Sequence, residues 1–273
     1  MKRSSPRLRP DRALEISELA EEISRGKGFP IDPRAILRAN GIRVTFNDYG
    51  EAFDGLLEHR SGRFHVFCNT ARVGKDTPRT RFTLAHELGH YFIDEHRRAL
   101  EAGRVRPHGS ICDFESPVEV ELEADCFAAS LLLPTSAVAP AVRGKARGLG
   151  GVVSLVAKFN TSITATAMRY LDVDPHPCVV IRWGLDGYAW KRLSESAYRA
   201  GLRKTVQDTA ALPRGCATAK VMAGSAKLES NGTTKAAWFP FVGDDWDSNA
   251  LFMEEAISLG KYGALTMLYP LDR

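Results

Sequence analysis

The chain has 273 residues, of which 44% are hydrophobic and 26% are charged, a composition typical of a globular protein with a sizeable core. No run of about 18 apolar residues occurs, and no apolar segment follows the basic residues at the N-terminus, so the sequence predicts neither a membrane span nor a secretory signal. The net charge of +4 permits contact with nucleic acid but does not require it.

The five cysteines are irregularly spaced and form no C-x-x-C pair. An odd number of scattered cysteines argues against a disulfide framework and favours a reducing compartment. We therefore expect a cytoplasmic protein whose cysteines are free thiols.

The first 70 residues predict two helices followed by three short strands. Apolar residues recur at helical spacing over 12–25, and a second short helix is framed by Asp32 before Pro33 and by Gly41. Alternation of apolar and polar residues predicts a strand over 42–46. Two further strands, 56–58 and 64–68, are joined around Ser61-Gly62, a hairpin signal.

The middle of the chain is predicted to be mainly helical. Thr77 followed by Pro78 predicts the start of a helix, and Pro134 ends another helix over 118–133. The remaining expectations are a loop over 102–117, a flexible link over 144–151, and helices over 152–159 and 162–171.

Two prolines at 174–177 bar regular structure, and the predicted elements change there from mainly helices to mainly strands. The sequence therefore predicts a domain boundary at this point. The elements expected beyond it are strands over 179–183, 188–191, 218–223 and 264–268, with helices over 194–202 and 248–259. The expected fold is therefore α+β. A mainly helical domain with a small sheet occupies residues 1–174, and a small α+β domain of unknown role occupies residues 175–273.

The strongest chemical signal is the segment His86-Glu87-Leu88-Gly89-His90. Residues at i and i+4 of a helix lie on one face, so His86 and His90 can bind one zinc ion. Zinc lowers the pKa of bound water toward neutrality, and Glu87 between the histidines can take the proton as a general base. The segment predicts a zinc-dependent peptidase.

The residues around this segment support the prediction. Phe82, Ala85, Leu88 and Phe92 form an apolar face opposite the histidines. Gly89 costs about 1 kcal/mol inside a helix relative to alanine, which suggests that another backbone approaches closely there.

A third metal ligand is required, and three residues compete. His96 has the spacing of the third histidine in the long H-E-x-x-H-x-x-G-x-x-H motif, but Ile93 replaces the glycine which that motif needs. We therefore expect His96 to be exposed near the end of the helix. The helix over 118–133 offers Glu121, with Glu123 as the alternative, and Asp125 one turn later could orient a ligating histidine through its second nitrogen.

These motifs resemble those of the ImmA/IrrE family of bacterial and phage metallopeptidases. The resemblance is carried by Arg81-Phe-Thr-Leu-Ala-His-Glu-Leu-Gly-His90, by Glu121-Leu-Glu-Ala-Asp-Cys-Phe-Ala-Ala-Ser-Leu-Leu-Leu-Pro134, and by the hairpin that begins at Asp54-Gly55. It covers roughly residues 12–171 and implies a gluzincin-like core, with Zn²⁺ bound by His86, His90 and Glu121. It also implies Glu87 as the base.

The resemblance further implies a role in gene regulation. Family members cut a cognate helix-turn-helix repressor and so release stress-response or mobile-element genes, which makes such a repressor the expected protein partner. Residues 152–171 resemble a helix-turn-helix loosely, and two helices packed under the peptidase core explain them as well. Some relatives carry a GAF-like sensor where residues 175–273 lie, which suggests a sensory role.

Two residues have weaker claims to substrate contact. Tyr91 flanks the second histidine and could polarise a substrate carbonyl, although packing or capping of the helix explains it better. The strand over 64–68, which carries His65, could hold an extended substrate if one of its edges is free. The alternative to the whole peptidase reading is a DNA- or partner-binding regulator with a non-catalytic zinc site, which the basic balance would permit.

Overall fold

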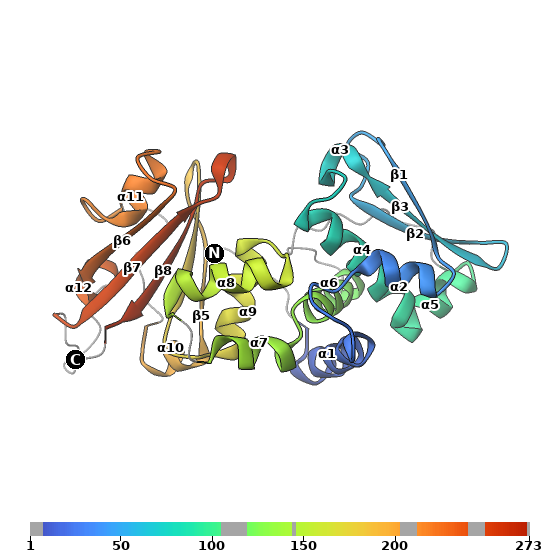
Figure 1. Cartoon of the computed structure of the whole chain (residues 1–273), viewed down its shortest axis with the longest axis horizontal. Coiled ribbons are helices and arrows are strands. Elements are labelled where there is room, and N and C mark those ends of the chain that lie inside the picture. The colour runs from blue at the N-terminus through green and yellow to red at the C-terminus, as the bar shows by residue number, and fades with distance from the viewer. Residues whose placement is uncertain (1–7, 105–118, 144–145, 203–211, 240–248, 272–273) are drawn as a thin grey trace. The chain divides into compact units, whose positions relative to one another are not determined.

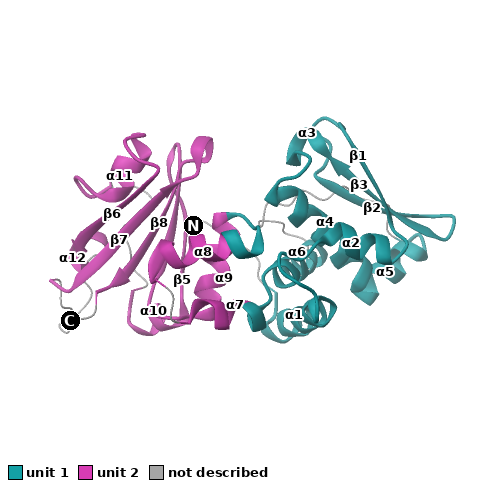
Figure 2. Ribbon diagram, in the orientation of Figure 1, with its two compact units in different colours: residues 1–137, 157–162 teal, residues 138–156, 163–273 magenta. Residues whose placement is uncertain are grey.

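The computed structural model describes residues 8–104, 119–143, 146–202, 212–239 and 249–271. Figure 1 shows a mixed α/β architecture with a small sheet formed by residues 43–69 and a larger sheet formed by residues 179–270, which confirms the expected fold class. The chain forms two compact units, residues 1–137 with 157–162 and residues 138–156 with 163–273 (Figure 2). The expected boundary at 174/175 lies inside the second unit, so a domain division there stays a prediction.

The first unit surrounds the predicted peptidase segment with helices and a three-stranded sheet. Its elements are α1 Pro10–Ser24, α2 Pro33–Ala39, β1 Arg43–Asn47, β2 Gly55–Arg60, β3 Arg63–Asn69, α3 Thr70–Val73, α4 Pro78–Phe92, α5 Asp94–Glu101, α6 Glu119–Leu132 and the first turn of α7 Thr135–Val142. Most of the loop predicted over 102–117 falls outside the described residues.

The small sheet has the order β1-β3-β2, with β1 parallel and β2 antiparallel to β3. Ser61 and Gly62 connect β2 to β3 with φ values of 51° and 73°, which fits a two-residue hairpin turn with two left-handed residues. Because β3 is the central strand, both of its edges are already paired. The idea that the strand over 64–68 holds substrate by strand addition is therefore wrong.

Helix α4 begins where the sequence predicts. The Thr77 side chain accepts a hydrogen bond from Thr80 N, the Thr80 hydroxyl accepts one from Thr77 N, and Pro78 occupies the first turn. The helix is buried along most of its length, with Phe82, Ala85 and Leu88 in the core of the first unit. This burial fixes the backbone that carries the two histidines.

Helix α6 packs closely against α4 at Gly89. A Cβ atom on Gly89 would lie 3.0 Å from Ala124 Cα and 3.2 Å from Phe127 Cβ, so only glycine lets the two helices approach this far. The expected close approach of another backbone is confirmed.

The second unit contains a five-stranded antiparallel sheet of order β5-β4-β8-β7-β6. Its remaining elements after α7 are α8 Gly148–Phe159 as far as Val156, α9 Ile163–Val173, β4 Val179–Gly184, β5 Gly187–Leu193, α10 Glu195–Arg199, α11 Ala217–Met222, β6 Leu228–Thr234, α12 Lys235–Trp238, β7 Leu251–Ser258, η1 Gly260–Tyr262 and β8 Ala264–Pro270.

Three local predictions in this part of the chain are wrong. The link over 144–151 ends early because α8 begins at Gly148, where Glu255 accepts a hydrogen bond from Leu149 N. The strand predicted over 218–223 is helix α11. The sulfur of Cys216 caps the N-terminus of this helix by accepting a hydrogen bond from Ala219 N. The helix predicted over 248–259 is largely strand β7.

Strand β7 shows why the last prediction is wrong. Its sequence is rich in helix-forming residues, but it pairs with β6 and β8 on its two sides and buries every second side chain, including Glu254. The Glu254 carboxylate accepts hydrogen bonds from Thr218 N and Thr218 Oγ1, each at 2.7 Å, which allows a charged residue type to occupy a core position. Sheet pairing therefore overrides local propensity here.

The helix pair over 152–171 is present as α8 and α9, joined by a short turn in which Asn160 has a φ of 51°. Arg192 of β5 binds Asp172 of α9 at 2.6 Å. Contact of this pair with DNA stays a prediction.

No single helix in the described part of the chain combines the length and apolarity needed to cross a bilayer, while the bent pair α6 and α7 passes that test by length and composition only.

Candidate metal centre and active site

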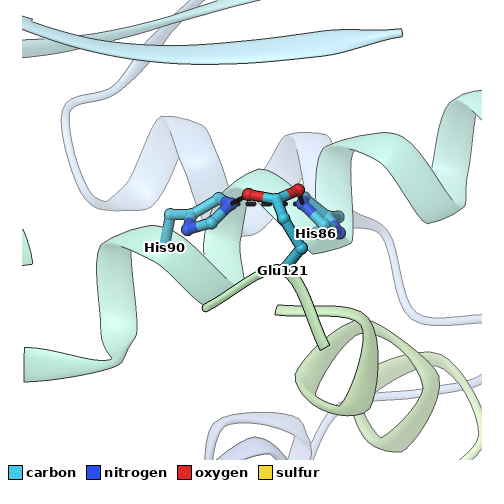
Figure 3. Close-up of side chains that lie close together, drawn as sticks. All are labelled: His86, His90 and Glu121. Carbon is cyan, nitrogen blue, oxygen red and sulfur yellow. Dashed lines mark hydrogen bonds and ion pairs between the residues drawn. The ribbon is translucent and has the colours of Figure 1, made fainter. Parts of the chain in front are cut away.

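Three predicted ligands converge inside the first unit. His86 and His90 lie one turn apart on α4, and Glu121 reaches them from the first turn of α6. Figure 3 shows the Glu121 carboxylate between the two imidazole rings, with one oxygen directed at each. All three side chains are buried, with relative exposures of 1%, 5% and 8% respectively.

The donor atoms have the spacing that one zinc ion requires. The two histidine Nε2 atoms are 3.1 Å apart, Glu121 Oε2 lies 3.2 Å from His86 Nε2, and Glu121 Oε1 lies 3.4 Å from His90 Nε2. Bonds of about 2.1 Å at tetrahedral angles separate neighbouring ligand atoms by about 3.4 Å. Two imidazole nitrogens and a carboxylate oxygen are also a donor set that zinc binds in hydrolytic sites. The residues present therefore fit the ion.

The protonation state of His90 suits a metal ligand. Burial lowers the pKa of His90 to about 4, with a smaller contribution from the neighbouring His86, against the opposing hydrogen bond to Glu121. The ring is neutral at physiological pH, so a lone pair on Nε2 is available for a metal.

Asp125 occupies the position that an orienting carboxylate requires. It lies on α6 one turn after Glu121, and its Oδ1 is 2.8 Å from His86 Nδ1. A hydrogen bond from Nδ1–H to Asp125 leaves the lone pair of His86 on Nε2, which faces Glu121 and His90.

Glu87 is fully buried and lies directly under the small sheet. A Cβ atom at Gly55, the first residue of β2, would lie 2.5 Å from Glu87 Oε1, so the backbone of β2 passes immediately over the carboxylate. Asp54 anchors this end of the strand, since its two carboxylate oxygens accept from Arg72 Nε at 2.7 Å and Arg79 Nη2 at 2.6 Å. The sequence pattern at Asp54-Gly55 thus has a physical role beside the site.

Glu123, the alternative third ligand, points away from the metal-binding group. Its Oε1 is bound by Arg12 Nε at 2.7 Å, and its Oε2 lies 2.8 Å from His96 Nε2. Burial alone would raise the pKa of Glu123, but the hydrogen bonds from Arg12 and His96 outweigh it and lower that pKa. An ionised Glu123 in an ion pair is thus a neighbour of the site and lies outside the group of three.

The expectation that His96 is exposed is wrong. His96 lies on α5 with a relative exposure of 7%, and its Nδ1 is 3.2 Å from Nδ1 of His90. Helix α4 ends at Phe92 and α5 starts two residues later, which turns His96 back toward the site. The spacing that makes His96 a candidate ligand was a true signal of proximity, because His96 contacts His90, one of the three candidate ligands.

The two residues with weaker claims lie on the sheet side of the site. Tyr91 packs edge-on against Phe64 of β3, with ring centroids 5.1 Å apart. His65 lies on the central strand and shares a hydrogen bond of 2.8 Å with Thr45 of β1. Contact of either residue with substrate stays a prediction.

Sequence reasoning missed Arg12 as a neighbour of the site. Its signal was weak, since Arg12 stands among several basic residues at the N-terminus. Only the packing of α1 on α6 brings its guanidinium to Glu123.

Comparisons with known proteins agree with this geometry. Residues 39–170 match the Peptidase_M78 family model, described as the IrrE N-terminal-like domain, and this segment contains α4 and α6 in full. A solved structure described as a Mycobacterium tuberculosis transcriptional regulator is similar in fold, with a TM-score of 0.55 and 13% identity over 96% of this chain and 89% of that chain. Identity this low shows a shared fold alone. No curated protein matches the chain.

Proposed function

Residues 39–170 belong to the IrrE N-terminal-like family of peptidases, and from this premise we propose that the chain is a zinc-dependent endopeptidase that cuts a regulatory protein. The observation that carries the proposal is the buried group of His86, His90 and Glu121, whose donor atoms have the mutual spacing of zinc ligands. Glu87 lies between the two histidines in sequence and is itself buried, as a general base requires.

The proposed chemistry divides the work between the ion and the chain. Zinc bound by His86, His90 and Glu121 would act as a Lewis acid and bring the pKa of water toward neutrality. The Glu87 carboxylate takes a proton from the attacking water and returns it to the departing amine nitrogen. Asp125 holds His86 in the tautomer and orientation that the site needs.

Strand β2 is the part of the sheet that we expect to bind substrate. It is an edge strand within the described residues, so one side of its backbone is unpaired. It begins at Gly55, next to Glu87. An extended peptide paired with this edge would pass close to the base, and main-chain hydrogen bonds would hold it with little dependence on its side chains.

The proposed substrate is a helix-turn-helix transcriptional repressor, whose cleavage would release stress-response or mobile-element genes. The supporting observations are the family match and the likeness in fold to a structure described as a transcriptional regulator. We further propose that the protein acts in the cytoplasm, since the described cysteines form no disulfide with one another, and that the C-terminal residues 175–273 control the peptidase as a sensor.

The test uses the full chain and a substitution that spares the ligands. Metal content is measured by mass spectrometry, and cleavage is measured first with a peptide library and then with any helix-turn-helix repressor that a neighbouring gene encodes. The wild type should bind one zinc and cut a defined bond, whereas Glu87→Gln should keep the zinc and lose cleavage. Cleavage retained by Glu87→Gln contradicts the proposed mechanism. Zinc binding without cleavage by the wild type, together with salt-dependent binding to duplex DNA, favours the non-catalytic regulator instead.

A further inference from the structure

A chain of hydrogen bonds leads from the ligand His90 out to the first helix. His90 Nδ1 lies 3.2 Å from His96 Nδ1, His96 Nε2 lies 2.8 Å from Glu123 Oε2, and Arg12 of α1 binds both oxygens of Glu123 at 2.7 and 3.1 Å. His90, His96 and Glu123 are all buried, and the side chain of Arg12 is 15% exposed. Four helices, α1, α4, α5 and α6, each contribute one residue.

The direction of the hydrogen bonds in this chain is determined at both ends. Nε2 of His90 faces His86 and Glu121, so metal binding leaves its proton on Nδ1. A hydrogen bond between the two facing Nδ1 atoms then requires His96 to accept, which places the proton of His96 on Nε2. That proton points at Glu123, a carboxylate that can only accept when ionised.

Arg12 fixes the outer end of this series of hydrogen bonds. Its two hydrogen bonds, one to each carboxylate oxygen, hold Glu123 in one orientation as the acceptor for His96 Nε2–H. Without an ionised acceptor at this position, His96 would be free to adopt the other tautomer, with its proton on Nδ1. Two N–H groups would then face each other when His90 binds metal, which weakens the site.

We propose that Arg12, Glu123 and His96 form a positioning relay that fixes the tautomer and orientation of His90 and thereby raises the affinity of the site for zinc. The inference rests on the proposed function of the metal centre. It also adds a residue from outside the family match to the support of the metal centre, because Arg12 precedes the matched segment, residues 39–170. Helix α1 thus becomes a functional part of the site.

A purely structural ion pair between α1 and α6 is the competing explanation. Such a pair would support the stability of the fold and leave the affinity for zinc unchanged. The two explanations therefore differ in the zinc dissociation constant measured on folded protein, and in the tautomer of His96.

The experiment compares four variants of the full chain in competition with a chromophoric zinc chelator. His96→Phe removes the acceptor and should raise the dissociation constant for zinc by about 10- to 100-fold, the usual effect of losing a partner of a ligating histidine. His96→Asn keeps an acceptor oxygen near the position of Nδ1 and should recover part of that loss. Arg12→Gln should weaken zinc binding in the same direction, but less, because Glu123 stays in place.

Glu15→Gln is the matched control. Glu15 also binds Arg12, at 2.9 Å, but its side chain is 67% exposed and lies outside the relay, so its loss should leave the dissociation constant unchanged. Urea unfolding of the metal-free variants shows which of them are folded, and only folded variants are compared.

Tautomers are read directly from ring ¹⁵N–¹H correlation spectra of the zinc-loaded wild type, which needs no variant. The relay requires a proton on Nδ1 of His90 and on Nε2 of His96. A proton on Nδ1 of His96, or a folded His96→Phe that binds zinc as tightly as the wild type, overturns the inference. A wild type that binds no zinc contradicts the proposed metal centre itself, so the two failures are distinguishable.

Discussion

Replacement of Gly55 by alanine should separate catalysis from metal binding. The new Cβ would lie 2.5 Å from Glu87 Oε1 and 2.5 Å from Thr83 Cγ2, whereas non-bonded heavy atoms are most stable at about 3.5 Å. The Glu87 carboxylate must therefore withdraw by about 1 Å. A catalytic group misplaced by that distance can lower the rate about 100-fold, which corresponds to about 2.7 kcal/mol of transition-state stabilisation.

The cost in stability should be smaller than the cost in activity. The Glu87 carboxylate ends a flexible side chain, so it can move aside without moving the backbone. The collision with Thr83 Cγ2 is with a β-branched side chain and is harder to relieve. The double variant Gly55→Ala/Thr83→Ser, which removes that methyl group, should recover stability while activity stays low.

The assay is kcat/KM for a peptide that the wild type cuts, measured at equal zinc content. Gly28→Ala is the control, because a Cβ at Gly28 has no heavy atom within 4 Å and its backbone is not in the left-handed region. We expect wild-type activity for Gly28→Ala and a loss of about two orders of magnitude for Gly55→Ala. A Gly55→Ala variant with wild-type kcat/KM would refute the placement of Glu87 under β2 as the working position of the base.

Two further predictions concern residues of helix α4. Gly89→Ala gains about 1 kcal/mol of helix propensity but overpacks the rigid contact with Ala124, at a cost of about 1–3 kcal/mol. We expect a net loss of up to about 2 kcal/mol in urea unfolding, with weaker zinc binding because α6 carries Glu121; unchanged values for both would contradict the close contact. In the metal-free protein, the pKa of His90 is about 4, below the ordinary 6.5, so the unfolded chain binds more protons between these values and stability falls as pH drops through that window. Lowering the pH from 7 to 5 should cost about 2 kcal/mol through His90, and a folded His90→Asn variant should show a smaller loss; an equal loss in both proteins would contradict the assignment to His90.

Much of the first unit was predictable because its signals are local. Thr77 and Pro78 cap α4, Ser61-Gly62 has the left-handed backbone that a tight hairpin needs, and Gly89 marks the contact with α6. Each signal depends on neighbours within a few residues or on a steric limit that one residue type satisfies.

The second unit was harder to predict because its elements depend on distant partners. The residues of β7 favour a helix locally, and only the pairing with β6 and β8 makes them a strand. In the same way, Glu254 is an acceptable core residue only because Thr218, 36 positions earlier, donates to it.

The candidate site divides along the same line. The sequence by itself determined that His86 and His90 face the same way, with the candidate base Glu87 between them, because i and i+4 spacing on one helix dictates a shared face. It left Glu121 and Glu123 as alternatives, since residues two apart on a helix point in different directions and no local rule says which direction faces the histidines.

Tertiary structure decided which residues of different helices meet at the site. The packing of α6 on α4 brings Glu121 to the histidines, and the turn between α4 and α5 buries His96 against His90. The packing of α1 on α6 delivers Arg12 to Glu123, 111 residues away. Contacts over such separations depend on the burial of whole helix faces, so they cannot be predicted from a residue's neighbours in the sequence.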